Sequence, residues 1–198
     1  MSRIHLIAAV SAAALLGASA CSKPASTAAT ETTTTVAAAT PATDTEMNVK
    51  LAQDFVNAAG QAGLAEIETS KLALQHSNNP DVKAFAQMMI EDHTKAGEAL
   101  KAAAAAAALA PPSETLDESH MRRVNDLTQD KPGENFDADY MHLQVDAHGE
   151  AIKLFQDYAK DGKIPQVQSF AEATLPTLET HRTKADSVNE TLDKVTPS

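Results

Sequence analysis

The chain has 198 residues and a formal net charge of −11, with two tyrosines and no tryptophan. An acidic chain that lacks a basic cluster argues against nucleic acid as a partner. Its single cysteine, Cys21, excludes an intramolecular disulfide.

The N-terminus has the pattern of an exported lipoprotein. Arg3 precedes an apolar run over residues 4–17, which is too short to span a bilayer. Residues 18–21 end in Cys21 and resemble the processing site of a bacterial lipoprotein signal, although alanine stands where leucine is usual. We therefore expect a signal peptide over residues 1–20 and a lipid on Cys21, the alternatives being ordinary secretory cleavage or an unmodified thiol.

The residues after the cysteine indicate location and domain organisation. Serine rather than aspartate follows Cys21, which by lipoprotein sorting predicts an outer-membrane anchor facing the periplasm. Residues 21–44 are almost entirely Ala, Thr, Ser and Pro, a composition that buries too little surface to fold and predicts a disordered tether. Residues 45–198 have the length of one domain.

The first hairpin is predicted from helix start and stop signals. A helix runs from about residue 45 to 77, and Asn79 and Pro80 then form an N-cap and first helical position. The second helix continues through the alanine-rich stretch and breaks at the two prolines of residues 111–112, since poly-alanine is a strong helix former.

The second half of the domain follows a longer connection. A short helical segment is predicted over residues 113–127, ending in a turn at residues 130–133. The third helix spans about residues 135–162, and the fourth runs from 165 to about 194. Pro176 lies inside the fourth helix and predicts a kink or local unwinding there.

These elements predict an all-α domain. Two tight hairpins joined by a long connection describe a ferritin-like four-helix bundle, with a crossover that contains a short helix between helices two and three. A short internal repeat supports two related hairpins, because residues 80–86 match residues 165–171 at Pro, Val, Phe and Ala.

Each of the four long helices carries one ionisable residue within its apolar stripe. At about 100° per residue, these residues share a face with apolar neighbours one and two turns away. A buried polar group is costly unless it is paired, so the pattern predicts a common partner in the core. The four residues are Glu66, His93, His148 and His181.

Height along the bundle agrees with this interpretation. At about 1.5 Å per residue, Glu66 and His93 lie roughly 16 and 21 Å from the turn of their hairpin, and His148 and His181 roughly 20 and 27 Å from theirs. All four residues are therefore predicted to meet within about two helical turns near the middle of the bundle.

Three imidazoles and one carboxylate are suitable ligands for Fe, Zn, Cu or Mn. Two alternatives stay open: each histidine is an ordinary core residue with a satisfied hydrogen bond, or the four residues form a metal-free polar network around Glu66. Tyr140, Gln144 and Thr177 are candidate supporting groups because of the directions in which they point. The remaining histidines are expected to be incidental.

Three sequence blocks resemble the bacterial domain of unknown function 4142. They comprise residues 85–96, which contain Phe85 and Asp92-His93, residues 136–148, and residues 174–181, which contain Pro176 and His181. The resemblance implies a ferritin-like domain that is secreted or lipid-anchored. One departure is Ala147, where the family leads us to expect an acidic residue; Asp146 is a possible substitute from the neighbouring angle.

The acid spacing restricts the function. Ferritin-like di-iron proteins use Glu-x-x-His pairs on one helix face, whereas Glu91 and Glu179 lie two residues before His93 and His181. The sequence therefore favours a mononuclear site in a lipid-anchored envelope protein and gives little support to an enzyme. The alternative is a non-enzymatic envelope stress or interaction protein with a structural polar core and no metal.

Overall fold

The computed structural model describes residues 42–129 and 135–195, which form five α-helices and no strand. The all-α prediction is therefore confirmed for this part of the chain. The predictions for residues 1–20, for Cys21, for most of the tether and for the turn at residues 130–133 fall outside the described residues. The helices are α1 (Ala42–His76), α2 (Pro80–Ala106), α3 (Glu118–Gln129), α4 (Phe136–Asp161) and α5 (Pro165–Val195).

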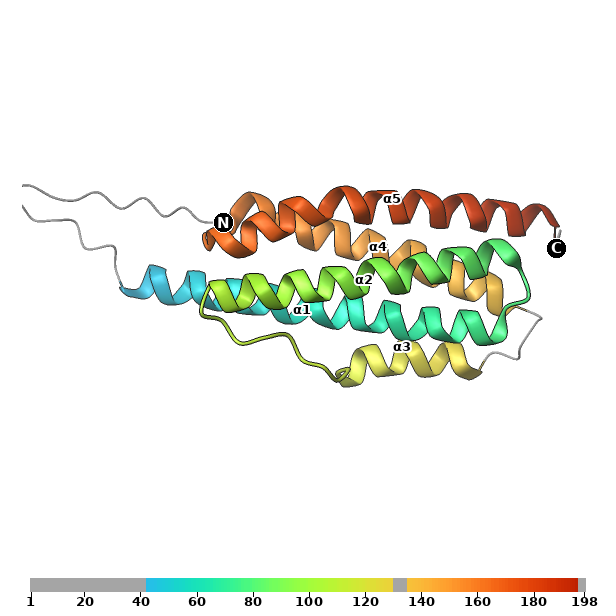
Figure 1. Cartoon of the computed structure of the whole chain (residues 1–198), viewed down its shortest axis with the longest axis horizontal. Helices are drawn as coiled ribbons and strands as arrows, with labels where there is room; N and C mark the ends of the chain where they lie inside the picture. Colours follow the sequence, from blue (N-terminus) through green and yellow to red (C-terminus); the bar gives the residue numbers. More distant parts are fainter. Residues whose placement is uncertain (1–41, 130–134, 196–198) are drawn as a thin grey trace, which may run out of the picture. The chain divides into compact units, whose positions relative to one another are not determined.

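Four of the helices pack as a closed ring around one core (Figure 1). Helix α1 contacts α2 and α4, and α5 contacts the other faces of α2 and α4. The most extensive contacts lie within the pairs α1–α2 and α4–α5, which are consecutive long helices joined by short turns. Helix α3 lies on the outside, mainly against α1, and belongs to the long connection between α2 and α4.

Local capping explains where two helices begin. The Asn79 side chain accepts hydrogen bonds from the backbone N–H groups of Asp81 and Val82, at 2.9 and 3.4 Å, and Pro80 occupies the first position of α2 as predicted. Helix α3 begins at Glu118 instead of residue 113, because Asp117 accepts from the backbone N–H of His120 at 2.9 Å and acts as its cap.

Two other helix ends differ from the sequence-based bounds. Helix α1 begins at Ala42, so residues 42–44 belong to the helix and not to the predicted tether. Helix α2 ends at Ala106, before the two prolines, because Ala108 adopts a left-handed conformation with φ of 55°. The backbone N–H of Leu109 then bonds to the carbonyl of Ala104 at 2.9 Å, which closes the end of the helix.

Helix α5 is continuous through Pro176, so the predicted local unwinding is wrong. A proline inside a helix removes one backbone hydrogen bond. Here Pro176 and Glu172, whose carbonyl loses that bond, are both exposed residues, so the loss falls on the solvent side of the helix. The helix therefore stays intact and carries His181 at the height that an unbroken helix requires.

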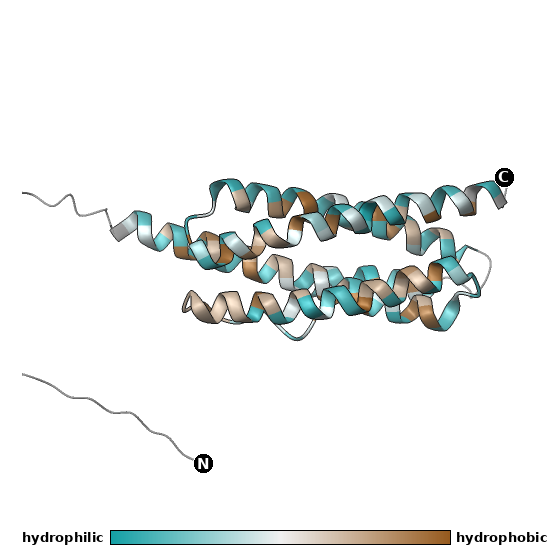
Figure 2. Cartoon of the chain, turned by 45° about the horizontal axis from the view of Figure 1, so that its top comes forward, coloured by the Kyte–Doolittle hydropathy of each residue, from teal (hydrophilic) through white to brown (hydrophobic). Residues whose placement is uncertain are grey.

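The core has two apolar parts with a polar layer between them. One part includes Phe55, Leu100, Phe155 and Leu178, and the other includes Met89, Tyr140 and Ala185. Along every long helix the ionisable residue falls between these two parts. Figure 2 shows the corresponding mixture, with hydrophobic and hydrophilic residues interleaved along each helix. In the described residues, no helix is both long enough and apolar enough to cross a bilayer.

Candidate metal centre

The polar layer contains one ionisable side chain from each helix of the ring. Glu66 comes from α1, His93 from α2, His148 from α4 and His181 from α5. Their exposed fractions are 4, 6, 0 and 2%, respectively, so all four are buried. The predicted convergence of these residues is therefore present in the structure.

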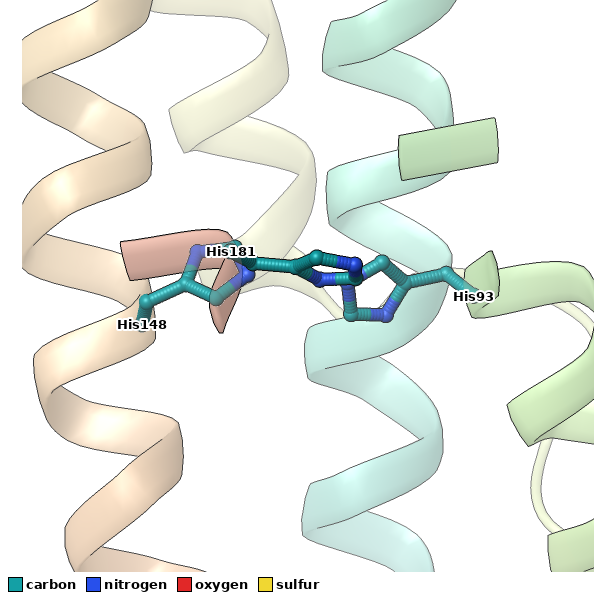
Figure 3. A group of neighbouring side chains, drawn as sticks. All are labelled: His93, His148 and His181. Atoms are coloured by element: carbon teal, nitrogen blue, oxygen red, sulfur yellow. The ribbon is translucent and has the colours of Figure 1, made fainter. Parts of the chain in front are cut away.

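The three imidazole rings form a nearly equilateral triangle, with their side chains pointing toward one another (Figure 3). The ring centroids of His93 and His148 are 5.7 Å apart, those of His93 and His181 are 5.3 Å apart, and those of His148 and His181 are 5.4 Å apart. One nitrogen from each ring can be chosen so that all three lie within 4.8 Å of one another. In the described residues this is the only group of three or more such ligands.

Glu66 lies beside two of the rings. Its Oε2 is 3.3 Å from Nδ1 of His93, and its Oε1 is 3.4 Å from Nδ1 of His148. These contacts place the carboxyl group next to the Nδ1 atoms. His181 is instead paired with Asp92, whose Oδ2 lies 3.1 Å from Nε2 of the ring.

The hydrogen bonds fix which nitrogen carries the proton in two of the rings. Nδ1–H of His148 donates to the backbone carbonyl of Gln144 at 2.8 Å, since a carbonyl only accepts. Nε2–H of His181 donates to the Asp92 carboxylate. In His93, Nδ1 lies 3.3 Å from Oε2 of Glu66, an oxygen that can accept a hydrogen bond from Nδ1–H. Each ring then keeps one nitrogen with a free lone pair.

Those remaining nitrogens have no partner. Nε2 of His93, Nε2 of His148 and Nδ1 of His181 are buried and make no hydrogen bond, and Oε1 of Glu66 makes none either. Buried polar atoms are normally paired, so each exception requires an explanation. Three such exceptions fall within one buried layer, at the point where the rings face one another (Figure 3).

Burial sets the charge of the cluster. It raises the pKa of Glu66 to about 8, an effect that Arg123 partly offsets. Burial, with a contribution from the neighbouring rings, lowers the pKa of His93 to about 3, and burial lowers that of His148 to about 4. The pKa of His181 is also lowered by burial, against the opposing effect of Asp92. Near pH 7 the four groups are therefore uncharged, and their short contacts are not ion pairs.

A second layer of hydrogen bonds supports the histidine on α4. Nε2 of Gln144 donates to the Thr69 hydroxyl at 3.1 Å, and that hydroxyl donates to the Ala65 carbonyl at 3.0 Å. Gln144 thus bonds to His148 through its backbone carbonyl and to α1 through its side chain. Among the three predicted supporting groups, Gln144 has this role, Tyr140 bonds to Ser70 at 2.8 Å, and Thr177 is exposed.

Asp92 was not predicted as a site residue, although it directly precedes His93. One residue corresponds to about 100° on a helix, so Asp92 faces α5 while its neighbour faces the core. Its pKa is lowered, chiefly by the hydrogen bond from His181, so it remains a carboxylate. The adjacency of an acid and a core histidine was the available sequence signal.

The acidic position expected from the family lies next to the cluster but not in it. Ala147 lines a cavity of about 250 Å³ that also reaches Glu66, Gln144 and Arg123. Asp146 is exposed and does not replace the missing acid. Among the described residues, Glu66 contacts His93 and His148 at Nδ1, and Asp92 contacts His181 at Nε2.

The fold and this buried layer define a helical-bundle protein with a three-histidine core. The chain belongs to the family described as "Domain of unknown function (DUF4142)", which matches residues 24–188. No curated protein matches the sequence.

A crystal structure of a DUF305 fragment from Deinococcus radiodurans is similar in fold, with a TM-score of 0.61 and 17% sequence identity. The match covers 71% of this chain and 95% of that one, and at this identity it concerns the fold alone.

Proposed function

We propose that this chain is a lipid-anchored envelope protein whose ferritin-like bundle binds one transition-metal ion through His93, His148 and His181, with Glu66 as a supporting carboxylate. The observation that carries the proposal is the set of three buried imidazole nitrogens without partners. Neutral imidazole is the form that coordinates Fe, Zn, Cu or Mn, and burial keeps these rings neutral.

The surrounding hydrogen bonds match the requirements of metal-binding histidines. Such ligands usually donate their second N–H to a carbonyl or carboxylate, which orients the ring. Gln144 supplies the carbonyl for His148, and Asp92 supplies the carboxylate for His181. Glu66 is placed to do the same for His93.

The geometry requires a modest contraction when an ion binds. Nitrogens at about 2.0 Å from a tetrahedral ion lie roughly 3.3 Å apart. In this structure, one nitrogen from each of the three rings can be chosen so that the distances between them are at most 4.8 Å. Small side-chain rotations on three separate helices can supply this difference. Three ligands leave a fourth position free for water or another donor, as in sites with three protein ligands.

A single ion is favoured over a di-iron centre. Di-iron sites in such bundles use carboxylates from all four helices. Among the described residues, Glu66 of α1 brings one to the polar layer, and Asp92 of α2 lies at its edge against His181. This arrangement gives no support to an oxidase. Metal supply or protection from metal stress in the envelope is more consistent with one ion held mainly by imidazoles.

The test is to strip the purified protein with chelator and to titrate it separately with Fe²⁺, Zn²⁺, Cu²⁺ and Mn²⁺. We expect one ion per chain and a higher melting temperature for at least one metal. His148→Gln should abolish this binding, whereas His142→Gln, a change at an exposed histidine of the same helix, should retain it. Failure of all four metals to bind would exclude the proposal.

The competing function is a metal-free envelope stress or interaction protein with a structural polar core. The contacts of neutral Glu66 with two rings favour it, but the three unpartnered nitrogens do not. It predicts that the combined change of His93, His148 and His181 to leucine leaves a folded protein that still functions in cells. Loss of function in a well-folded triple variant would contradict it.

The anchoring part of the proposal is supported by the sequence of residues 1–22. Cell fractionation should place the wild-type chain in the outer membrane. Cys21→Ser should release it into a soluble or uncleaved form, because no lipid can then be attached. Membrane association that persists unchanged in this variant would contradict the lipid anchor.

A further inference from the structure

A second site adjoins the polar layer on the side between α1 and α2. A cavity of about 350 Å³ extends from the protein surface inward to Glu66 and His93. Its deeper walls are apolar and include Leu100, Phe155 and Leu178. A volume of this size lies within the range of sites for small organic molecules.

Small residues keep this space open. Gly60, Ala62 and Gly63 line it from α1, and Ala96 and Gly97 line it from α2. A Cβ atom added at Gly97 would meet no atom within 4 Å. Gly97 lies one turn after His93 on the same face of α2, so a larger side chain there would project into the cavity.

The mouth of the cavity is formed by the connection between α2 and α3. Pro112 packs against Gly60, and Glu114 bonds to Lys101 at 2.8 Å. The Gln61 side chain holds this connection in place, since it donates to the Thr115 carbonyl at 2.9 Å and accepts from the Asp117 N–H at 2.7 Å. The opening is therefore built into the fold.

The inner end is polar, because Glu66 and His93 both line it. Oε2 of Glu66 and Nδ1 of His93 lie 3.3 Å apart. Besides Glu66 and His93, the ionisable residues that line the cavity are Glu98, Lys101 and Glu114, and all three are exposed. An anionic ligand end placed beside the Glu66 carboxyl group would lose its hydration deep in an apolar cavity, a costly transfer.

We propose that this cavity binds a small uncharged molecule with an apolar body of about six to eight carbon atoms and one hydroxyl end, which hydrogen-bonds to Glu66. The apolar body contacts Leu100, Phe155 and Leu178, and the hydroxyl bonds to the Glu66 carboxyl group on the side of His93. The inference goes beyond the proposed metal site, because His148 and His181 do not line this cavity. Binding is expected with and without an ion.

The probe is 1-hexanol, titrated into the chelator-treated protein by calorimetry and located by NMR contacts between its methylene protons and the Phe155 ring. We expect saturable binding of one molecule. Hexanoate, which has a six-carbon chain and an anionic end, should bind at least about tenfold more weakly because its charge must be desolvated beside a carboxyl group.

Gly97→Leu should weaken 1-hexanol binding by about tenfold or more, because it fills the cavity. The matched control is Ala102→Leu, an exposed position on the same helix outside the cavity, which should bind normally. Equal binding by both variants, equal binding of the two probes, or no NMR contact with Phe155 would overturn the proposal. Because chelator is present, these outcomes are independent of whether a metal binds.

Discussion

Nε2 of His181 donates a 3.1 Å hydrogen bond to Oδ2 of Asp92, across the interface between α5 and α2. Asp92 directly precedes His93, so two consecutive residues of α2 act on the polar layer in different ways. His93 enters the layer itself, and Asp92 orients the ring that comes from the opposite hairpin. The bond leaves Nδ1 of His181 as the nitrogen that faces the other two rings.

Asp92→Asn should weaken metal binding about 10- to 100-fold, the usual effect of losing an outer carboxylate from a histidine ligand. The amide can still accept a hydrogen bond but no longer supplies the negative charge. Competition with a chromophoric chelator measures the change.

Glu91→Gln is the matched control, because Glu91 is exposed and its carboxylate contacts only Gln87 on the same helix. It should leave metal affinity within about twofold of the wild type, in line with the small effect of surface charge changes. An Asp92→Asn variant with wild-type affinity would show that this pair does not orient a ligand.

The metal-free protein should lose stability in mildly acidic solution. The pKa values of His93, at about 3, of His148, at about 4, and of His181 lie below their ordinary value in the folded state. Below about pH 6.5 the unfolded chain therefore binds more protons than the folded protein, and the free energy of unfolding decreases as the pH is lowered.

Glu66 acts in the opposite direction. Its pKa of about 8 in the folded protein lies above the unfolded value, so its contribution is present at low pH and is lost as pH rises through 8. The histidines outweigh the one carboxyl group, so the free energy of unfolding should fall by about 1 kcal/mol or more as the pH is lowered from 6.5 to 5. Urea unfolding in the presence of chelator measures this, and a constant free energy of unfolding from pH 7 to 5 would contradict it.

Metal binding at pH 7 should release about one proton per ion. The histidines are already neutral, so the proton comes from Glu66 when the cation lowers the pKa of this carboxyl group from about 8. Calorimetry in buffers with different ionisation enthalpies counts the released protons.

Glu66→Gln should bind the ion with almost no proton release, and the wild type should behave in the same way above pH 9. Release of two or more protons by the wild type would contradict this account, because Glu66 can supply only one.

The same substitution at two glycines should have opposite effects on stability. Gly97→Ala enters open space within α2 and should stabilise the protein by about 1 kcal/mol through helix propensity. Gly60→Ala would place its Cβ against Pro112 and should destabilise it by about 1–2 kcal/mol, even after the propensity gain. Thermal unfolding of both variants provides the measurement. A Gly60→Ala variant as stable as Gly97→Ala would show that the connection after α2 does not pack firmly on α1.

Much of the fold and the inner residues of the site could be predicted from the sequence, because both depend on helical periodicity. The angle of each polar residue on its helix and its distance from the turn were sufficient to bring together Glu66, His93, His148 and His181. Asn79 and Pro80 likewise determine the start of α2 through local hydrogen bonding and a fixed backbone angle.

The sequence was less informative where a residue depends on a neighbouring helix. Asp92 gains its role only because α5 packs beside α2, and Pro176 is tolerated on the exposed side of α5. The start of α3 depends on the Asp117 side chain, which competes with earlier turn residues. The cavity beside Glu66 depends on how Pro112 rests on Gly60.

The polar layer takes two residues from each hairpin: Glu66 and His93 from α1–α2, and His148 and His181 from α4–α5. Neither hairpin alone has three histidines in this layer, so a separated half of the domain should bind an ion weakly or not at all. An ion at this position would act as a cross-link between the two halves, and separation of the hairpins would release it. Occupancy would then report whether the bundle is fully assembled.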